Sequence, residues 1–210
     1  MTIPSASSAG YERLRQRVQE ALDYNAESPG VEFKESRPWS SLRVKIAKTA
    51  MAMANLRDGG LLIVGRGNGH GRPEGMSSED FADYDGDTIR DFVDSYASPS
   101  VQLAIASVEV SERLYIAIDI SQFTELPVIC KKAYDPDLKS GAIYIRPYVG
   151  RPRSRGVETA EDLRELLEIA AELQARKLMI QARRAGFEVS PPDRTARDLY
   201  ASELGGLHGV

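Results

Sequence analysis

Hydrophobic and polar positions follow helical and strand periods over most of the 210-residue chain. Apolar residues at helical spacing predict helices from about Gly10 to Asn25, from Ser40-Ser41 to Asn55, and from Asp87 to Tyr96. The continuous apolar run 61–64 predicts a central strand that is covered on both faces. Further strands are expected at 31–35, 101–110, 114–120, 127–130 and 142–146, the second and third of these as an antiparallel pair.

The carboxyl-terminal part of the chain predicts one more long helix. Thr159, followed three residues later by Asp162, resembles a capping box, and the helix should run to about Ala185 and end at Gly186. We expect a disordered N-terminus over residues 1–9, one domain over 10–175, and a helix end with a flexible tail over 176–210. The order of elements predicts an α+β fold with a long C-terminal helix. The end of that helix could pair with a second subunit or fold back on the sheet.

The composition narrows the class of protein. The chain is 42% hydrophobic and 28% charged, and no apolar run approaches the roughly 20 residues of a membrane span. The N-terminus lacks the basic and apolar blocks of a signal peptide, so we expect a cytoplasmic protein with no membrane partner. A single cysteine, Cys130, excludes a cysteine-rich zinc site, and a histidine-dependent hydrolase would rest on His70 alone because His208 falls in the predicted tail.

Charge is distributed unevenly along the chain. The net charge is −4, yet the segment from Leu126 to Gly156 holds two acids, Asp135 and Asp137, against seven basic residues. The basic residues are Lys131, Lys132, Lys139, Arg146, Arg151, Arg153 and Arg155. Such a segment could contact the phosphates of a nucleic acid, or it could pair with the acidic helices of the protein itself.

Residues 27–34 hold the densest candidate chemistry. A strand that starts near Val31 places Glu32 and Lys34 on one face and Phe33 on the other, while Pro29-Gly30 could turn Glu27 back towards Glu32. Two carboxylates beside a lysine could bind a divalent cation and position a phosphate. The same residues could equally form a surface hairpin with a solvated salt bridge.

The glycine-rich stretch from Gly65 to Gly71 does not predict a nucleotide site. No Gly-Lys-Ser/Thr follows it, no helix begins at once, and the turn continues through 72–75, so neither a P-loop nor a dinucleotide fingerprint fits. A tight hairpin is expected there, and no nucleotide cofactor is predicted.

Several motifs occur in an order that resembles the Schlafen AlbA-type nucleic-acid-binding domain over roughly residues 20–170. They are Glu27-x-x-x-x-Glu-Phe-Lys34, Lys48-Thr-Ala-Met-Ala-Met-Ala-Asn55, Asp58-Gly-Gly-Leu-Leu-Ile-Val-Gly65, Pro73-Glu-Gly75 and Gly141-Ala-Ile-Tyr-Ile-Arg146. This family occurs in Schlafen proteins and in many bacterial proteins described as regulators. The resemblance implies an α+β fold with a mixed central sheet, flanking helices and a nucleic-acid-binding face.

The resemblance also implies a metal-dependent site. Schlafen endoribonucleases cut structured RNAs such as transfer RNA with two glutamates, an aspartate and a divalent metal, and Glu27 and Glu32 match the two glutamates. The third position falls at Asn68, which brings an amide oxygen but no charge, so Mg²⁺ or Mn²⁺ should be held more weakly. Asp58 could substitute for it. Glu27, Glu32, Lys34 and Asn68 are therefore the candidate catalytic residues, and Glu27, Glu32 and Asn68 the candidate metal ligands.

Three functions follow from these observations. The first is binding of nucleic acid, with RNA favoured over DNA, without efficient cleavage. Its phosphate contacts would come from Lys34, Lys131, Lys132, Arg146, Arg151, Arg153 and Arg155. The second is a metal-dependent endoribonuclease that acts on structured RNA. The third is a protein-interaction or assembly module that forms a homo-oligomer through the long terminal helix.

Overall fold

The computed structural model describes residues 9–67, 74–148 and 150–187 of the chain. Its helices are α1 (Ala9–Tyr24), α2 (Trp39–Ala54), α3 (Ser78–Ala82), α4 (Gly86–Tyr96) and α5 (Ala160–Arg184). Its strands are β1 (Val31–Lys34), β2 (Gly60–Val64), β3 (Ala97–Ser98), β4 (Leu103–Val110), β5 (Arg113–Ile120), β6 (Ile129–Cys130), β7 (Tyr144–Ile145) and β8 (Arg155–Gly156). The predicted α+β class is confirmed.

The main sheet is mixed, with the strand order β1-β2-β5-β4. β1 runs parallel to β2, whereas β2 with β5 and β5 with β4 pair antiparallel. Every residue of β2 is buried, as the apolar run predicted for a central strand. Glu32 pairs with Leu62 and Phe33 with Ile63, which fixes the direction in which each β1 side chain points.

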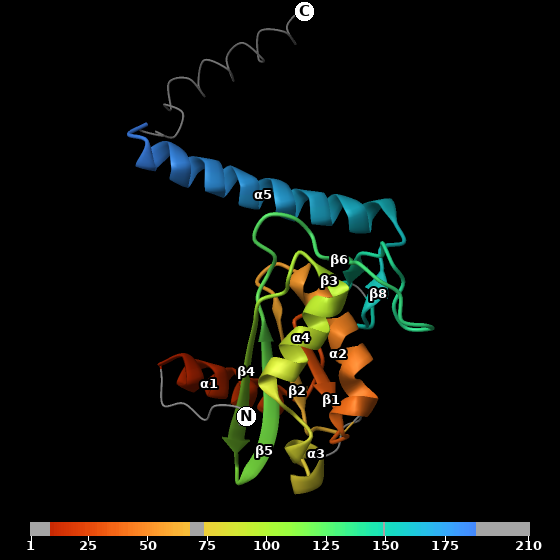
Figure 1. The fold of residues 1–210 in the computed structure, drawn as a ribbon. Coiled ribbons are helices and arrows are strands. Elements are labelled where there is room, and N and C mark those ends of the chain that lie inside the picture. Colours follow the sequence, from red (N-terminus) through yellow and green to blue (C-terminus); the bar gives the residue numbers. More distant parts are fainter. Residues whose placement is uncertain (1–8, 68–73, 149, 188–210) are drawn as a thin grey trace, which may run out of the picture. The chain divides into compact units, whose positions relative to one another are not determined.

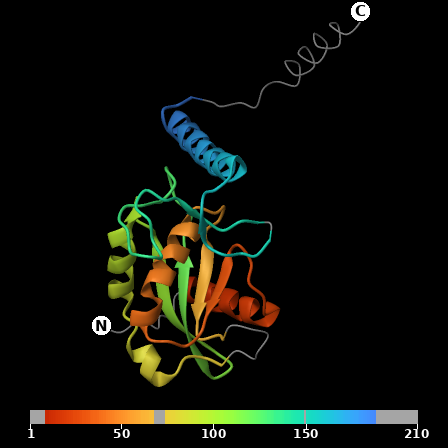
Figure 2. The same ribbon diagram turned by 90° about the vertical axis from the view of Figure 1, so that its right-hand side faces the viewer.

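The two faces of this sheet are covered by different helices (Figures 1 and 2). On one face α1 contributes Leu14, Val18 and Leu22 to a core that includes Phe33 and Ile63. On the other face α2 contacts β2, and α4 contacts α2 in turn. The approach of α2 is close, since a Cβ at Gly60 would lie 2.6 Å from the Sδ of Met53.

The segment that follows β5 is held against the end of α2 by one buried side chain. The Nδ2 of Asn55 donates to the carbonyls of Val128 and Tyr144, each at 2.9 Å, and its Oδ1 accepts from the N–H of Val128 at 2.7 Å. These bonds hold the basic segment, residues 126–156, against the end of α2. β7 is shorter than the strand predicted over 142–146, because it ends where Arg146 turns its side chain towards the residues before β1.

α5 begins with the predicted capping box. The Oγ1 of Thr159 accepts from the N–H of Asp162, and the Oδ2 of Asp162 accepts from the N–H of Thr159, both at 3.1 Å. Gly186 follows the helix with a φ of 85°. The chain divides into one compact unit up to Ala170 and another from Ala171.

Some predictions lie outside the described residues. They concern the N-terminal residues up to 8, most of the glycine-rich stretch, and the tail from 188. Among the described helices none is long and apolar enough to cross a bilayer.

Candidate functional site

A tight turn in front of β1 returns Glu27 towards the strand. The N–H of Ser28 donates to the carbonyl of Val31 at 3.1 Å, and the N–H of Val31 donates back at 3.2 Å, with Pro29 and Gly30 at the corner. The Oε1 of Glu27 then accepts a hydrogen bond from the N–H of Phe33 at 3.2 Å. Glu27 is exposed, so this bond orients its carboxylate without removing it from water.

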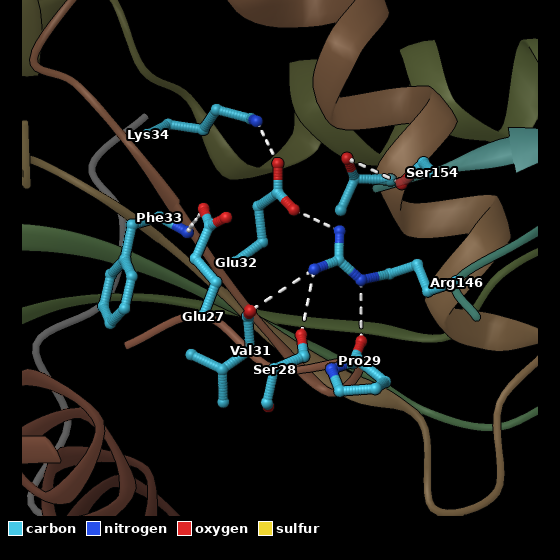
Figure 3. A network of polar contacts seen from close by, with 10 residues as sticks. Glu27, Ser28, Pro29, Val31, Glu32, Phe33, Lys34, Arg146 and Ser154 are labelled. Carbon is cyan, nitrogen blue, oxygen red and sulfur yellow. Dashed lines mark hydrogen bonds and ion pairs between the residues drawn. The ribbon is translucent and has the colours of Figure 1, made fainter. Parts of the chain in front are cut away.

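Glu32 is buried between two cations on the opposite side of β1 from Phe33. Its Oε1 is ion-paired with the Nζ of Lys34 and its Oε2 with Arg146, and only 8% of the residue is exposed (Figure 3). Both carboxylate oxygens therefore have a cationic partner. The cost of burying this charge is therefore offset by a cation on each side of the carboxylate.

Arg146 connects the turn at residues 28–31 with the carboxylate of Glu32 in β1. Its Nε donates to the carbonyl of Pro29 at 2.7 Å, and its Nη2 donates to the carbonyls of Ser28 at 2.9 Å and Val31 at 3.4 Å (Figure 3). Its side chain has no exposed surface. Arg146 is thus not available for the phosphate contact expected of it, because its guanidinium is enclosed and its donors are used within the protein.

Above this network lies a cleft of about 900 Å³. Five cationic and three acidic side chains line it, together with Asn25, Ala26, Thr49 and Ser154. The cations are Lys34, Lys45, Lys48, Arg66 and Arg153, and the acids are Glu27, Glu32 and Asp137. With Glu32 compensated by Lys34 and by the buried Arg146, the accessible surface of the cleft carries an excess of positive charge. We call it the basic cleft.

Two lysines of α2, the exposed Lys45 and the partly exposed Lys48, line the basic cleft. Lys45 and Lys48 stand three residues apart, so both project from one side of the helix. Within the described part of the chain neither has an acidic partner, although the Nζ of Lys48 lies 5.1 Å from the centre of the Tyr144 ring. Beside them the hydroxyl of Ser154 donates to the Oγ1 of the buried Thr49 at 3.4 Å.

Arg66 forms the wall of the basic cleft next to Glu27. Its guanidinium binds the side chain and the carbonyl of Asn25 and lies 4.1 Å from the centre of the Phe33 ring. Burial lowers the pKa of Arg66, and the nearby charge of Glu27 opposes that shift. Arg66 therefore packs on the core residue Phe33 and also adds its positive charge to the basic cleft.

The other predicted basic residues divide into two groups. Arg153 lines the basic cleft, whereas Lys131, Lys132 and Arg151 are exposed but do not line it. Arg155 binds Asp162 with two parallel bonds of 2.7 and 2.9 Å. This pairing holds the pKa of Asp162 well below its usual range. Burial acts in the opposite direction and raises the pKa, whereas hydrogen bonds from the N–H groups of Glu158 and Thr159 lower it further.

The predicted metal ligands lie only partly within the described residues. No group of three His, Cys, Asp or Glu side chains is gathered for a metal among residues 9–67, 74–148 and 150–187. Glu27 and Glu32 share the basic cleft, but both oxygens of Glu32 are engaged by cations, and Asn68 lies outside the described residues. Asp58, the substitute offered by the sequence, lies in the turn before β2 and does not line the cleft.

Lys45 and Lys48 line the basic cleft but were not among the site residues predicted from the sequence. The signal was present, since α2 carries three basic residues and no acid. Asp137, Thr49 and Ser154 had no comparable signal, because they reach the cleft only through the folding of distant segments.

A family model described as Schlafen, AlbA_2 matches residues 27–148. The chain is also similar to the crystal structure of the DIP2311 protein from Corynebacterium diphtheriae, with 22% identity and a TM-score of 0.50 over 75% of this chain and 29% of that one. A solution NMR structure of the N-terminal domain of a RecG-related protein from Nitrosomonas europaea matches with 18% identity and a TM-score of 0.41 over 70% of this chain and 95% of that one. This chain thus spans less than a third of the first of these proteins. No curated protein matches it.

Proposed function

Because the chain belongs to the Schlafen AlbA_2 family, we propose that it binds nucleic acid through the basic cleft. The observation that carries this proposal is the excess of cations over acids in a cleft of about 900 Å³, with Lys45 and Lys48 free of acidic partners among the described residues. Ammonium and guanidinium groups on an open surface are the groups that contact phosphates.

The chemistry of the basic cleft favours recognition of the backbone over recognition of bases. Lys34, Lys45, Lys48 and Arg153 offer charge and hydrogen-bond donors to phosphate oxygens, and the hydroxyls of Thr49 and Ser154 could contact sugar. We propose RNA as the polymer, following the resemblance to Schlafen proteins. Affinity of this kind falls steeply as salt rises.

The test measures RNA binding by fluorescence anisotropy from about 50 to 200 mM salt. The variant Lys45→Ala/Lys48→Ala should bind more weakly, and its plot of log K against log salt should be flatter by about 1.4 if two contacts to a single strand are lost. A matched control is Arg13→Ala/Arg164→Ala, which removes two exposed cations that do not line the cleft. No binding by the wild type at low salt, or equal losses in both variants, would refute the proposal.

A second candidate function is metal-dependent cleavage of structured RNA. What supports it is that Glu27, Glu32 and Lys34 line one cleft. Incubation of transfer RNA with the protein and Mn²⁺ or Mg²⁺ tests it, and Glu27→Gln is the informative variant because Glu27 is the exposed carboxylate. Intact RNA with the wild type, or equal cleavage by Glu27→Gln, would exclude this function. The assembly role of the last helix stays a prediction.

A further inference from the structure

A second, smaller cleft adjoins the basic cleft. Its volume is about 240 Å³, and it is lined by Lys34, Glu35, Arg37, Ser41, Leu42 and Lys45. Lys34 and Lys45 line both clefts, so these two side chains form the border between them. We call this the side cleft.

The side cleft is also predominantly basic. Three of its lining residues are cations and one is an acid, Glu35, which pairs with Arg37 at 2.8 Å. The side chain of Arg37 is still 60% exposed. A guanidinium has five N–H donors, and the pair with Glu35 uses only some of them. The backbone of Arg37 is fixed, because its carbonyl accepts a hydrogen bond from the hydroxyl of Tyr84 at 3.0 Å.

The size of the side cleft suits a part of a ligand. Sites for whole small molecules measure about 300–1,000 Å³, a range that includes the basic cleft but not the side cleft. A cavity of about 240 Å³ lined by three cations has room for a phosphate group and its immediate linkage.

One face of α2 connects the two clefts. Ser41, Lys45 and Lys48 follow each other at intervals of four and three residues, so they form a row along one side of the helix. Seven residues at 1.5 Å each make this row about 10 Å long. Ser41 lies in the side cleft and Lys48 in the basic cleft. A single phosphate cannot contact both ends of the row, whereas a chain of linked phosphates can.

We propose that the side cleft is a second phosphate site, which holds a phosphate next along the strand from those in the basic cleft. This rests on the proposed function, and it specifies the ligand as an oligonucleotide strand that passes from one cleft to the other over Lys34 and Lys45. Of the three cations that line the side cleft, Arg37 is the one that does not also line the basic cleft.

The test uses the full chain, Arg37→Ala, and a labelled single-stranded oligouridylate of about 12 nucleotides. Arg37→Ala should bind more weakly, and its plot of log K against log salt should be flatter by about 0.7, the value for one phosphate contact to a single strand. Between 50 and 200 mM salt this slope change corresponds to about a threefold difference in relative affinity. The control is Arg164→Ala, an exposed arginine with its own acidic partner, Glu161, that lines neither cleft.

The outcomes separate this inference from the proposed function. If the wild type binds the strand and Arg37→Ala has an unchanged salt slope, or loses no more than Arg164→Ala does, the second phosphate site is refuted and the basic cleft stands. If the wild type does not bind the strand at all, both are refuted. A flatter slope in Arg37→Ala alone, with an unchanged thermal transition, supports the second site.

Discussion

Glu32 and Arg146 lie 114 residues apart in the chain and form a buried ion pair beneath the basic cleft. Arg146 also donates to the carbonyls of Pro29, Ser28 and Val31, so a single guanidinium holds both the turn and the carboxylate of the strand that follows it. The position of Glu27 and Lys34 at the cleft therefore depends on a residue that never reaches the cleft surface.

Replacing Arg146 should destabilise the whole fold. In Arg146→Met the carboxylate of Glu32 loses one of its two cations and the carbonyls of Pro29, Ser28 and Val31 each lose a donor. Removal of one member of a buried pair typically costs about 3–5 kcal/mol. Arg146→Lys should recover little of the lost stability, because an ammonium group cannot replace a planar guanidinium that contacts four acceptors. Urea unfolding measures both variants. A loss below about 1 kcal/mol in Arg146→Met would show that the network contributes little to stability.

The two glutamates should behave differently when each is changed to glutamine. Glu32→Gln leaves Arg146 as an unpaired buried cation and should lower the free energy of unfolding by about 3 kcal/mol. Glu27→Gln is at an exposed position and keeps an oxygen that can accept from the N–H of Phe33, so its change should stay within about 0.5 kcal/mol. Chemical unfolding of the pair tests this. Equal effects would contradict the structural role assigned to Glu32.

Local patterns predicted the parts of the fold that depend on neighbouring residues. The alternation of Glu32, Phe33 and Lys34 placed Phe33 in the core and the charged pair on the other face. The Thr159–Asp162 spacing predicted the start of α5, and the apolar run predicted the central strand β2. In each case the information lies within a few residues, where period and capping chemistry decide the structure.

Other features depend on contacts between distant segments. Arg146 occurs in a basic segment and has the composition of a phosphate ligand, and only its position beneath the 28–31 turn makes it structural. α3 was not predicted because five residues are too few to establish a helical period. Lys45 and Lys48 become part of a site because the fold brings Glu32 and Lys34 of β1 to the same cleft.

Asn55 should be essential for holding the segment that supplies Arg146. Asn55→Ala removes three buried hydrogen bonds to Val128 and Tyr144 and leaves their backbone groups unpaired, so we expect a loss of about 2–4 kcal/mol. Asn55→Asp should be at least as damaging, since it places a charge against two carbonyl oxygens. Thermal unfolding is the measurement. A stability equal to the wild type in either variant would show that this segment is held by other contacts.

The pair of Asp162 and Arg155 should make stability depend on pH. The pKa of Asp162 is lowered in the folded protein, chiefly by its bonds to Arg155, so its contribution is complete above the unfolded-state pKa of about 3.9 and is lost as the pH falls through the lower, folded-state pKa. Asp162→Asn should therefore be less stable than the wild type by about 1–2 kcal/mol at pH 7 and at pH 5. The difference should shrink progressively below about pH 4. Asp87→Asn is the control, because it breaks an exposed pair with Arg90 that contributes at most about 0.5 kcal/mol. A gap between wild type and Asp162→Asn that stays constant from pH 7 to the most acidic conditions would contradict the assignment of this pair to the charge of Asp162.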